Sequence, residues 1–213
     1  MSAAPDVLPA KNETVFIVDD DASFLRSLGR MLTGAGYRVC GFASATELLK
    51  NLEPEAIGCV VADLQMPGID GLELQEALGR SRNPLPVVFL TGQGDIPSTV
   101  RAMRGGAEDF LMKMAGKEEI LQAVERALGR ARAEREGREA RLRWRKRFQL
   151  LSDRELEVLK EVVQGKMNKQ IAEKLNITER TVKLHRTTLT RKLNVFSVAE
   201  LTRLVADAKL FEE

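Results

Sequence analysis

The sequence has few of the residues that build covalent or metal-bound scaffolds, with two cysteines and one histidine among 213 residues. Cys40 and Cys59 fall in apolar, strand-like runs and lack the spacing of metal ligands, which favours two buried thiols over a disulfide or a metal site. His185 has no nearby partner for a metal, which favours a buried or phosphate-facing polar role. These scarcities argue against a disulfide-rich or zinc-bound scaffold.

A long hydrophobic run is also missing. Residues 1–13 do not combine a basic start with an apolar stretch, as a signal peptide does, and no later segment is long enough to span a bilayer. We therefore expect a cytoplasmic protein without a membrane partner.

Net charge is small, at +2, but this sum hides a division along the chain. Residues 1–125 carry 18 acidic and 11 basic side chains, residues 126–147 carry 3 and 10, and residues 148–213 carry 10 and 12. The length fits one or two domains, and 44% hydrophobic residues are enough for folded cores. The division predicts an acidic first domain and a basic second half. Only the second half is expected to bind a polyanion.

One apolar run, residues 57–62, is rich in β-branched side chains and predicts a strand buried on both faces, as in a parallel sheet. Asp63 follows where this strand ends. Ligands of open α/β sheets bind outside the carboxyl ends of the strands, so Asp63 is placed for chemistry. The plainer alternative is that Asp63 only starts the next loop.

Similar strand-like runs alternate with segments of helical periodicity throughout the first half. The further strands are expected at 14–18, 37–42, 85–90 and 109–112, and the helices at 22–33, 45–52, 71–78, 96–104 and from 117 onward. Parallel neighbours need crossover connections, so the alternation predicts a doubly wound, five-stranded parallel sheet of the α/β class. From residue 151 the pattern is helical only, which predicts a small all-α domain.

Polar residues stand at four of the predicted strand ends. Asp19 and Asp20 follow the first strand as part of a run of three acids. The repulsion among three adjacent carboxylates favours a shared cation over a solvated turn. Thr91 ends the fourth strand and Lys113 follows the fifth. Taken singly, Thr91 is a turn hydroxyl and Lys113 a surface charge, but together with Asp63 they predict one polar pocket.

Such a pocket suits phosphoryl transfer. The transferred group carries charge on its equatorial oxygens, so its transfer depends on positioning and positive charge. Mg²⁺ prefers oxygen ligands such as Asp19, Asp20 and Asp63, Lys113 would pair with a phosphoryl oxygen, and Thr91 would donate a hydrogen bond. Asp63 would accept the phosphoryl group as an acyl phosphate.

This arrangement resembles the receiver domain of two-component response regulators over about residues 13–128. The motifs that carry the resemblance are Val-Asp-Asp-Asp at 18–21, Asp-Leu-Gln-Met-Pro-Gly-Ile-Asp-Gly at 63–71, Leu-Thr-Gly at 90–92 and Gly-Ala-Glu-Asp-Phe-Leu-Met-Lys at 106–113. The resemblance implies a flavodoxin-like fold and phosphorylation of Asp63 by a sensor histidine kinase. It also implies Mg²⁺ bound by Asp20, Asp63 and the Gln65 carbonyl, and a switch in which Thr91 moves toward the phosphoryl group while Phe110 repacks inward.

One residue departs from the receiver pattern. Receivers usually follow the lysine with a proline, often through a cis bond that aims the ammonium, whereas Met114 follows Lys113 here. A cis bond without proline costs about 3–4 kcal/mol, so a trans bond is expected. This leaves open a differently aimed Lys113 and a weak or absent phosphorylation.

Residues 129–147 are strongly basic and sparsely apolar, which predicts a helical linker that continues from the first domain. Its charge either neutralises the acidic first domain or adds phosphate contacts on DNA. Both interpretations remain open.

Residues 148–213 predict a helix-turn-helix domain. Ser152 and Glu155 form a capping box at the start of its first helix. Asn168 is expected to cap a second helix over 169–175, and Thr178 a third over 179–193, after a tight turn at 176–177. Two helices joined by so short a turn place the second one for the major groove.

The side of the third helix opposite its apolar stripe is cationic or hydroxylic. The runs 151–159 and 168–185 resemble the LuxR-type (FixJ- and NarL-like) DNA-binding domain, over about residues 149–208. The resemblance implies base contacts by Lys183, Leu184 and Thr187. It implies phosphate contacts by Lys166, Asn168, Lys169, Thr178, Arg180, Thr181 and Arg191. Relatives use part of the last helix, expected at 198–210, to form dimers.

The sequence therefore predicts a transcription regulator and not an enzyme. In this class the phosphoryl group shifts an existing equilibrium toward a homodimer that binds double-stranded promoter DNA. One alternative keeps the DNA binding but makes the first domain independent of phosphorylation. Another is a phosphohydrolase with an aspartate nucleophile, but such enzymes usually place a second acid where Gln65 stands.

Overall fold

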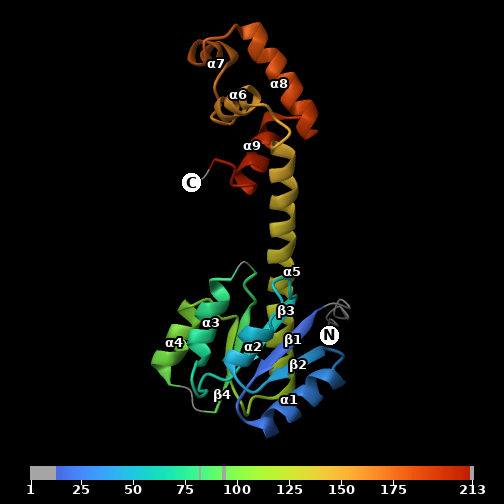
Figure 1. Cartoon of the computed structure of the whole chain (residues 1–213), viewed down its shortest axis with the longest axis vertical. Helices are drawn as coiled ribbons and strands as arrows, with labels where there is room; N and C mark the ends of the chain where they lie inside the picture. Colours follow the sequence, from blue (N-terminus) through green and yellow to red (C-terminus); the bar gives the residue numbers. More distant parts are fainter. Residues whose placement is uncertain (1–12, 82, 93–94, 212–213) are drawn as a thin grey trace, which may run out of the picture. The chain divides into compact units, whose positions relative to one another are not determined.

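The computed structural model describes residues 13–81, 83–92 and 95–211 of the chain. Its contacts divide the chain into two compact units, one up to Ala133 and one from Glu134. Figure 1 labels the helices and strands of both units, and each unit has separate hydrophobic clusters.

Within the described residues of the first unit, five strands form one parallel sheet in the order β2-β1-β3-β4-β5. The strands are β1 (Thr14–Val18), β2 (Arg38–Phe42), β3 (Gly58–Ala62), β4 (Val87–Thr91) and β5 (Asp109–Met112). The predicted doubly wound parallel sheet is confirmed. The chain builds outward from β1 to β2 and then returns to β3, so the direction of winding reverses between β1 and β3. Ligands of such sheets bind at this reversal.

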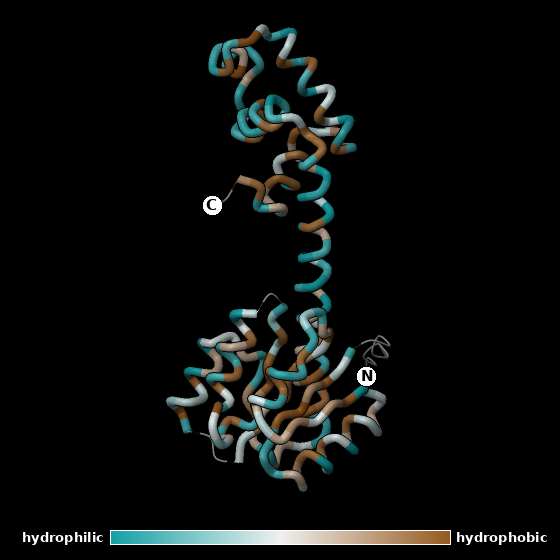
Figure 2. Tube along the Cα trace, in the orientation of Figure 1, coloured by the Kyte–Doolittle hydropathy of each residue, from teal (hydrophilic) through white to brown (hydrophobic). Residues whose placement is uncertain are grey.

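Helices cover both faces of the sheet. They are α1 (Ala22–Gly34), α2 (Ala45–Asn51), α3 (Gly71–Gly79), α4 (Ile96–Arg104) and α5 (Lys117–Phe148). One core joins the sheet to α2, α3 and α4 through Leu48, Leu74 and Ala102, and the other joins it to α1 and α5 through Leu32 and Val124. Every residue of β3 is buried between these layers, and Figure 2 shows hydrophobic residues concentrated along the strands.

The edge strand β2 corrects one expectation from the sequence. Cys59 on β3 is buried, and burial raises the pKa of its thiol, but Cys40 on β2 is exposed. β2 pairs only with β1, so an apolar run at this edge does not imply burial.

The second unit contains the end of α5 with α6 (Asp153–Val163), α7 (Asn168–Leu175), α8 (Glu179–Leu193) and α9 (Val198–Asp207). Its core gathers apolar side chains from all of these, including Phe148, Leu159, Ile171 and Leu189. No helix in the described part of the chain is both long and apolar enough to cross a membrane.

Two of the predicted caps are present in the second unit and one is not. Glu155 accepts a hydrogen bond from the Ser152 amide at 2.8 Å and donates its own amide to Ser152 Oγ at 3.3 Å, which is the expected capping box. Thr178 caps α8 by accepting from the Thr181 amide at 3.1 Å. Asn168 does not cap α7, because the helix already begins at Asn168 and Met167 occupies the cap position.

Candidate functional site

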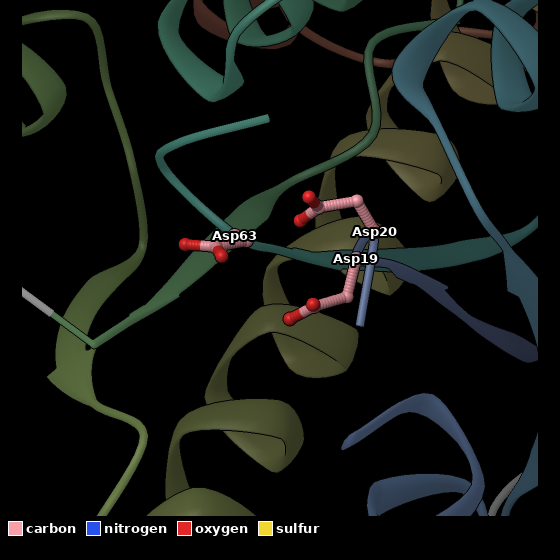
Figure 3. Close-up of side chains that lie close together, drawn as sticks. All are labelled: Asp19, Asp20 and Asp63. Carbon is pink, nitrogen blue, oxygen red and sulfur yellow. The ribbon is translucent and has the colours of Figure 1, made fainter. Parts of the chain in front are cut away.

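Three carboxylates converge at the carboxyl ends of β1 and β3. Asp19 and Asp20 follow β1, Asp63 follows the neighbouring β3, and each offers an oxygen within 4.8 Å of the others. Figure 3 shows the three side chains reaching to the same side of the strand ends. The sheet reverses its winding between these two strands. The topology therefore brings Asp20 and Asp63 together, although they are 43 positions apart in the sequence.

The cluster is partly withdrawn from water. Asp19 is 1% exposed and Asp63 is 8% exposed, whereas Asp20 is exposed. Burial raises the pKa of Asp19 above its ordinary value of 3.8, although hydrogen bonds from Lys113 and from the Asp21 amide oppose this effect. A buried carboxylate is costly unless a cation or hydrogen bonds compensate it.

Lys113 supplies part of that compensation. Its Nζ lies 2.7 Å from Asp19 Oδ2 and 2.8 Å from Asp63 Oδ2. Burial acts to lower the pKa of Lys113, but the hydrogen bonds to the two carboxylates outweigh it and raise the pKa. One ammonium facing three carboxylates leaves an excess of negative charge, which suits a divalent cation with oxygen ligands.

Lys113 reaches the cluster although Met114 replaces the usual proline. The Lys113–Met114 bond is trans, the Lys113 amide donates to the Thr91 carbonyl at 2.8 Å, and Met114 is 87% exposed. Pairing of β5 with β4 therefore delivers the lysine to the carboxylates. The differently aimed lysine that the sequence left open is not found.

The other residues predicted for this site lie on β4, on β5 and in the loop after β3. Thr91 ends β4 and is 1% exposed, and Phe110 on β5 is half-buried with its ring centroid 6.1 Å from that of Phe89. Gln65 is exposed in the loop after β3, and its backbone amide donates to Asp63 Oδ1 at 3.3 Å.

Two residues of the receiver-like motifs have roles that the sequence did not reveal. Asp21, the third acid of the run, lies outside the cluster and caps α1 by accepting from the Ser23 and Phe24 amides. Gly71 begins α3 where a Cβ would lie 2.5 Å from the Asp63 carbonyl oxygen. Gly71 therefore allows the loop after Asp63 to close against the strand end.

The candidate DNA interface is the exposed side of α8. Val182 and Leu189 face the core with no exposed surface, whereas the predicted base-contacting residues Lys183, Leu184 and Thr187 are exposed, Leu184 by 64%. Among the predicted phosphate contacts, Lys169, Thr178, Arg180 and Arg191 are exposed and Thr181 is half-buried. α8 thus has one apolar and one cationic side.

Two predicted phosphate contacts already have partners within the second unit. Lys166 pairs with Glu161 of α6, and Asn168 Oδ1 accepts a hydrogen bond from Arg186 Nη1 at 2.8 Å. No motif in the sequence indicates a role for Glu161, which is 3% exposed, or for Arg186. Helical periodicity identifies apolar stripes, so an acid on the buried side of α6 is easily overlooked.

Comparison with known proteins identifies both units. The receiver domain of response regulators matches residues 15–125, and the luxR family of bacterial regulatory proteins matches residues 149–205. Nodulation protein W of Bradyrhizobium diazoefficiens is 43% identical over 190 residues, which cover 89% of this chain and 84% of that protein. The transcriptional regulatory protein FixJ of the same organism is 34% identical over 199 residues, which cover 93% and 97%.

Solved structures agree over nearly the whole chain. The response regulator StyR superposes with a TM-score of 0.77 at 44% identity, covering 92% of this chain and 98% of StyR. Full-length FixJ of B. japonicum superposes with a TM-score of 0.57 at 33% identity, covering 95% and 100%. The chain therefore belongs to the two-component response regulators that join a receiver domain to a LuxR-type DNA-binding domain.

Proposed function

We propose that a sensor histidine kinase phosphorylates this response regulator on Asp63, and that the phosphorylated form binds promoter DNA through α8 to regulate transcription. The observation that carries the proposal is the convergence of Asp19, Asp20 and Asp63 with the Lys113 ammonium at adjacent strand ends. The family supports both halves of it, because it joins a receiver domain to a DNA-binding domain.

The geometry around Asp63 supports a direct transfer from the kinase. A carboxylate oxygen of Asp63 attacks phosphorus, an O–P bond forms as the P–N bond to the kinase imidazole breaks, and the imidazole nitrogen takes back its electron pair. Lys113, which contacts Asp63 Oδ2 at 2.8 Å, turns toward a phosphoryl oxygen, and the Thr91 hydroxyl donates to another. Asp19, Asp20, Asp63 and the Gln65 carbonyl would hold Mg²⁺, which neutralises charge on the phosphoryl oxygens when bound.

The proposed switch uses residues next to the acceptor. Thr91 is buried at the end of β4, and Phe110 packs against Phe89 from the neighbouring strand. Movement of Thr91 toward the phosphoryl group makes room for Phe110 to turn further inward. The phosphoryl group thereby stabilises one of two existing conformations.

A homodimer is the proposed outcome of that switch. β5 pairs with the strand that ends at Thr91, and β5, the turn after it and α4 carry exposed apolar side chains. An exposed apolar patch of this kind marks an interaction site. The residues of this surface are Ile96, Val100, Met103, Met112 and Met114, which are between 40% and 87% exposed.

Acetyl phosphate with Mg²⁺ tests the phosphorylation. Intact-mass spectrometry should detect one added phosphoryl group on the wild type and none on Asp63→Asn. Asp21→Asn is a matched control, because Asp21 caps α1 outside the cluster and asparagine also caps helices. This variant should still be phosphorylated.

A wild type that takes up no phosphoryl group would contradict the phosphorylation and leave the DNA binding intact. The regulator would then be independent of phosphorylation, the alternative that Met114 suggested. The position of Lys113 argues against it. A phosphohydrolase has less support, because Gln65 stands where such enzymes carry their second acid and an amide does not serve as a general acid.

A further inference from the structure

A buried glutamate in the last turn of α6 holds two lysines. Glu161 is 3% exposed, its Oε2 pairs with Lys166 Nζ, and its Oε1 lies 2.6 Å from Lys174 Nζ. Lys166 lies in the loop before α7 and Lys174 in the last turn of α7. The hydrogen bonds from the two lysines hold the pKa of Glu161 below its ordinary value of 4.5.

Packing alone does not account for an acid at this position. Its neighbours Val158, Leu159 and Val162 fill the core of the unit with apolar groups. Buried ion pairs are weak stabilisers, because an apolar replacement of similar size is often as stable. The arrangement therefore points to a use for the two ammonium groups themselves.

The two ammonium groups remain accessible from outside. The side chain of Lys166 is 32% exposed and that of Lys174 is 53% exposed. An ammonium has three donors, so each lysine can contact Glu161 and still donate to another acceptor. Lys166 is also one of the residues proposed to contact DNA phosphates.

We propose that Glu161 is a positioning residue of the DNA interface, which holds Lys166 and Lys174 ready for the phosphate backbone. This inference rests on the proposed DNA binding. A flexible lysine loses side-chain entropy when a phosphate fixes it, and a lysine already held by Glu161 has less to lose. The three groups together keep one net positive charge, so the positioned pair still attracts a polyanion.

Glu161→Gln separates positioning from simple charge. If only charge matters, removal of an acid near the interface strengthens DNA binding. The salt dependence of binding then stays the same or becomes steeper. Positioning predicts the opposite, a dissociation constant raised about three- to tenfold and a salt slope reduced by about 1, as for the loss of one phosphate contact.

The measurement uses full-length protein treated with acetyl phosphate and a labelled duplex selected by the wild type from a random pool. Glu173→Gln is the matched control, because it removes the same charge from α7, and within the described residues Glu173 itself forms no ion pair. This control should bind as tightly as the wild type or more tightly. Glu161→Gln that behaves like Glu173→Gln would overturn the proposal.

Lysine variants keep the test decisive if Glu161→Gln does not fold. Lys174→Met leaves Glu161 paired with Lys166, and it should weaken binding and lower the salt slope, with recovery in Lys174→Arg. Lys166→Met should do the same. If both methionine variants bind and respond to salt like the wild type, the proposal is wrong. Failure of the wild type to bind any duplex would instead contradict the proposed function.

Discussion

The receiver domain and the DNA-binding domain arrange their functional groups in opposite ways. In the receiver, residues from three strand ends meet in a cluster where Asp19 and Asp63 are buried and share Lys113. In the DNA-binding domain, the proposed base contacts come from a single helix and are exposed.

This difference has a physical cause. A phosphoryl group is small, and its charge is stabilised best by groups that are fixed and partly shielded from water. A duplex is long, and its phosphates are met by side chains that extend into solvent. Substitutions in the receiver's acidic cluster and the loop behind it should therefore disturb folding and chemistry together, whereas those on the outer side of α8 should disturb binding alone.

The largest expected effect contrasts the two sides of α8. Leu189→Ala removes a side chain with no exposed surface and should lower the free energy of unfolding of the second unit by about 2–5 kcal/mol. Leu184→Ala on the outer side should change it by less than about 0.5 kcal/mol and weaken DNA binding instead. Fluorescence of Trp144, the chain's one tryptophan, follows the unfolding because Trp144 packs against this core. Equal losses of stability would contradict the assignment of the two sides.

The substitution Gly71→Ala should lower both the stability of the receiver and its rate of phosphorylation. The Cβ of Gly71→Ala would lie 2.5 Å from the Asp63 carbonyl oxygen, so we expect a loss of about 1–3 kcal/mol in stability and slower phosphorylation by acetyl phosphate. Gly79→Ala has nothing within 4 Å and serves as the control. Normal phosphorylation of Gly71→Ala would show that the Asp63 loop tolerates displacement.

Substitutions on the outer side of α8 distinguish base contacts from phosphate contacts. Lys183→Ala should cost about 1–3 kcal/mol on the preferred site and relax sequence preference there. Arg180→Ala should weaken binding to all sequences alike and lower the salt slope by about 1. Titrations of preferred and random duplexes at several salt concentrations distinguish the two effects. Equal losses on random DNA for both variants would remove the assignment of Lys183 to a base.

The smallest expected effect is a dependence of stability on pH in the second unit. The pKa of Glu161 is lowered by folding, so its contribution is present above the ordinary value of 4.5 and is lost as the pH falls through the lower folded value. Denaturation followed by Trp144 fluorescence below pH 4.5 should show this loss. In Glu161→Gln, the free energy of unfolding should change less with pH in this range. If its pH dependence equals that of the wild type, other carboxylates dominate the pH dependence of stability.

Much of the architecture could be predicted from local patterns. β5 and α4 begin and end at the predicted residues, and α8 was expected over its observed span. The alternation of strands and helices predicted the parallel sheet, and the polar residues at strand ends predicted that Asp19, Asp20, Asp63 and Lys113 would come together. These predictions succeeded because secondary structure and crossover topology depend on neighbours along the chain.

Side-chain partners were harder to predict. Asp21 looked like a third member of the acidic cluster but caps α1. Asn168 was expected to cap α7 but instead accepts a hydrogen bond from Arg186 on α8. Which donor a carboxylate or an amide oxygen accepts from depends on the distances to all of its neighbours, and a single sequence does not contain these distances.

The sequence by itself determined the fold class and the family, because periodicity and strand-end residues can be recognised without knowing the structure. Only the tertiary structure decided that Lys113 reaches two carboxylates without the usual proline, and that Glu161 lies buried between two lysines. Both arrangements join residues from different elements of the fold. Their energies depend on burial and on distances of a few ångströms, which exist only after the chain has folded.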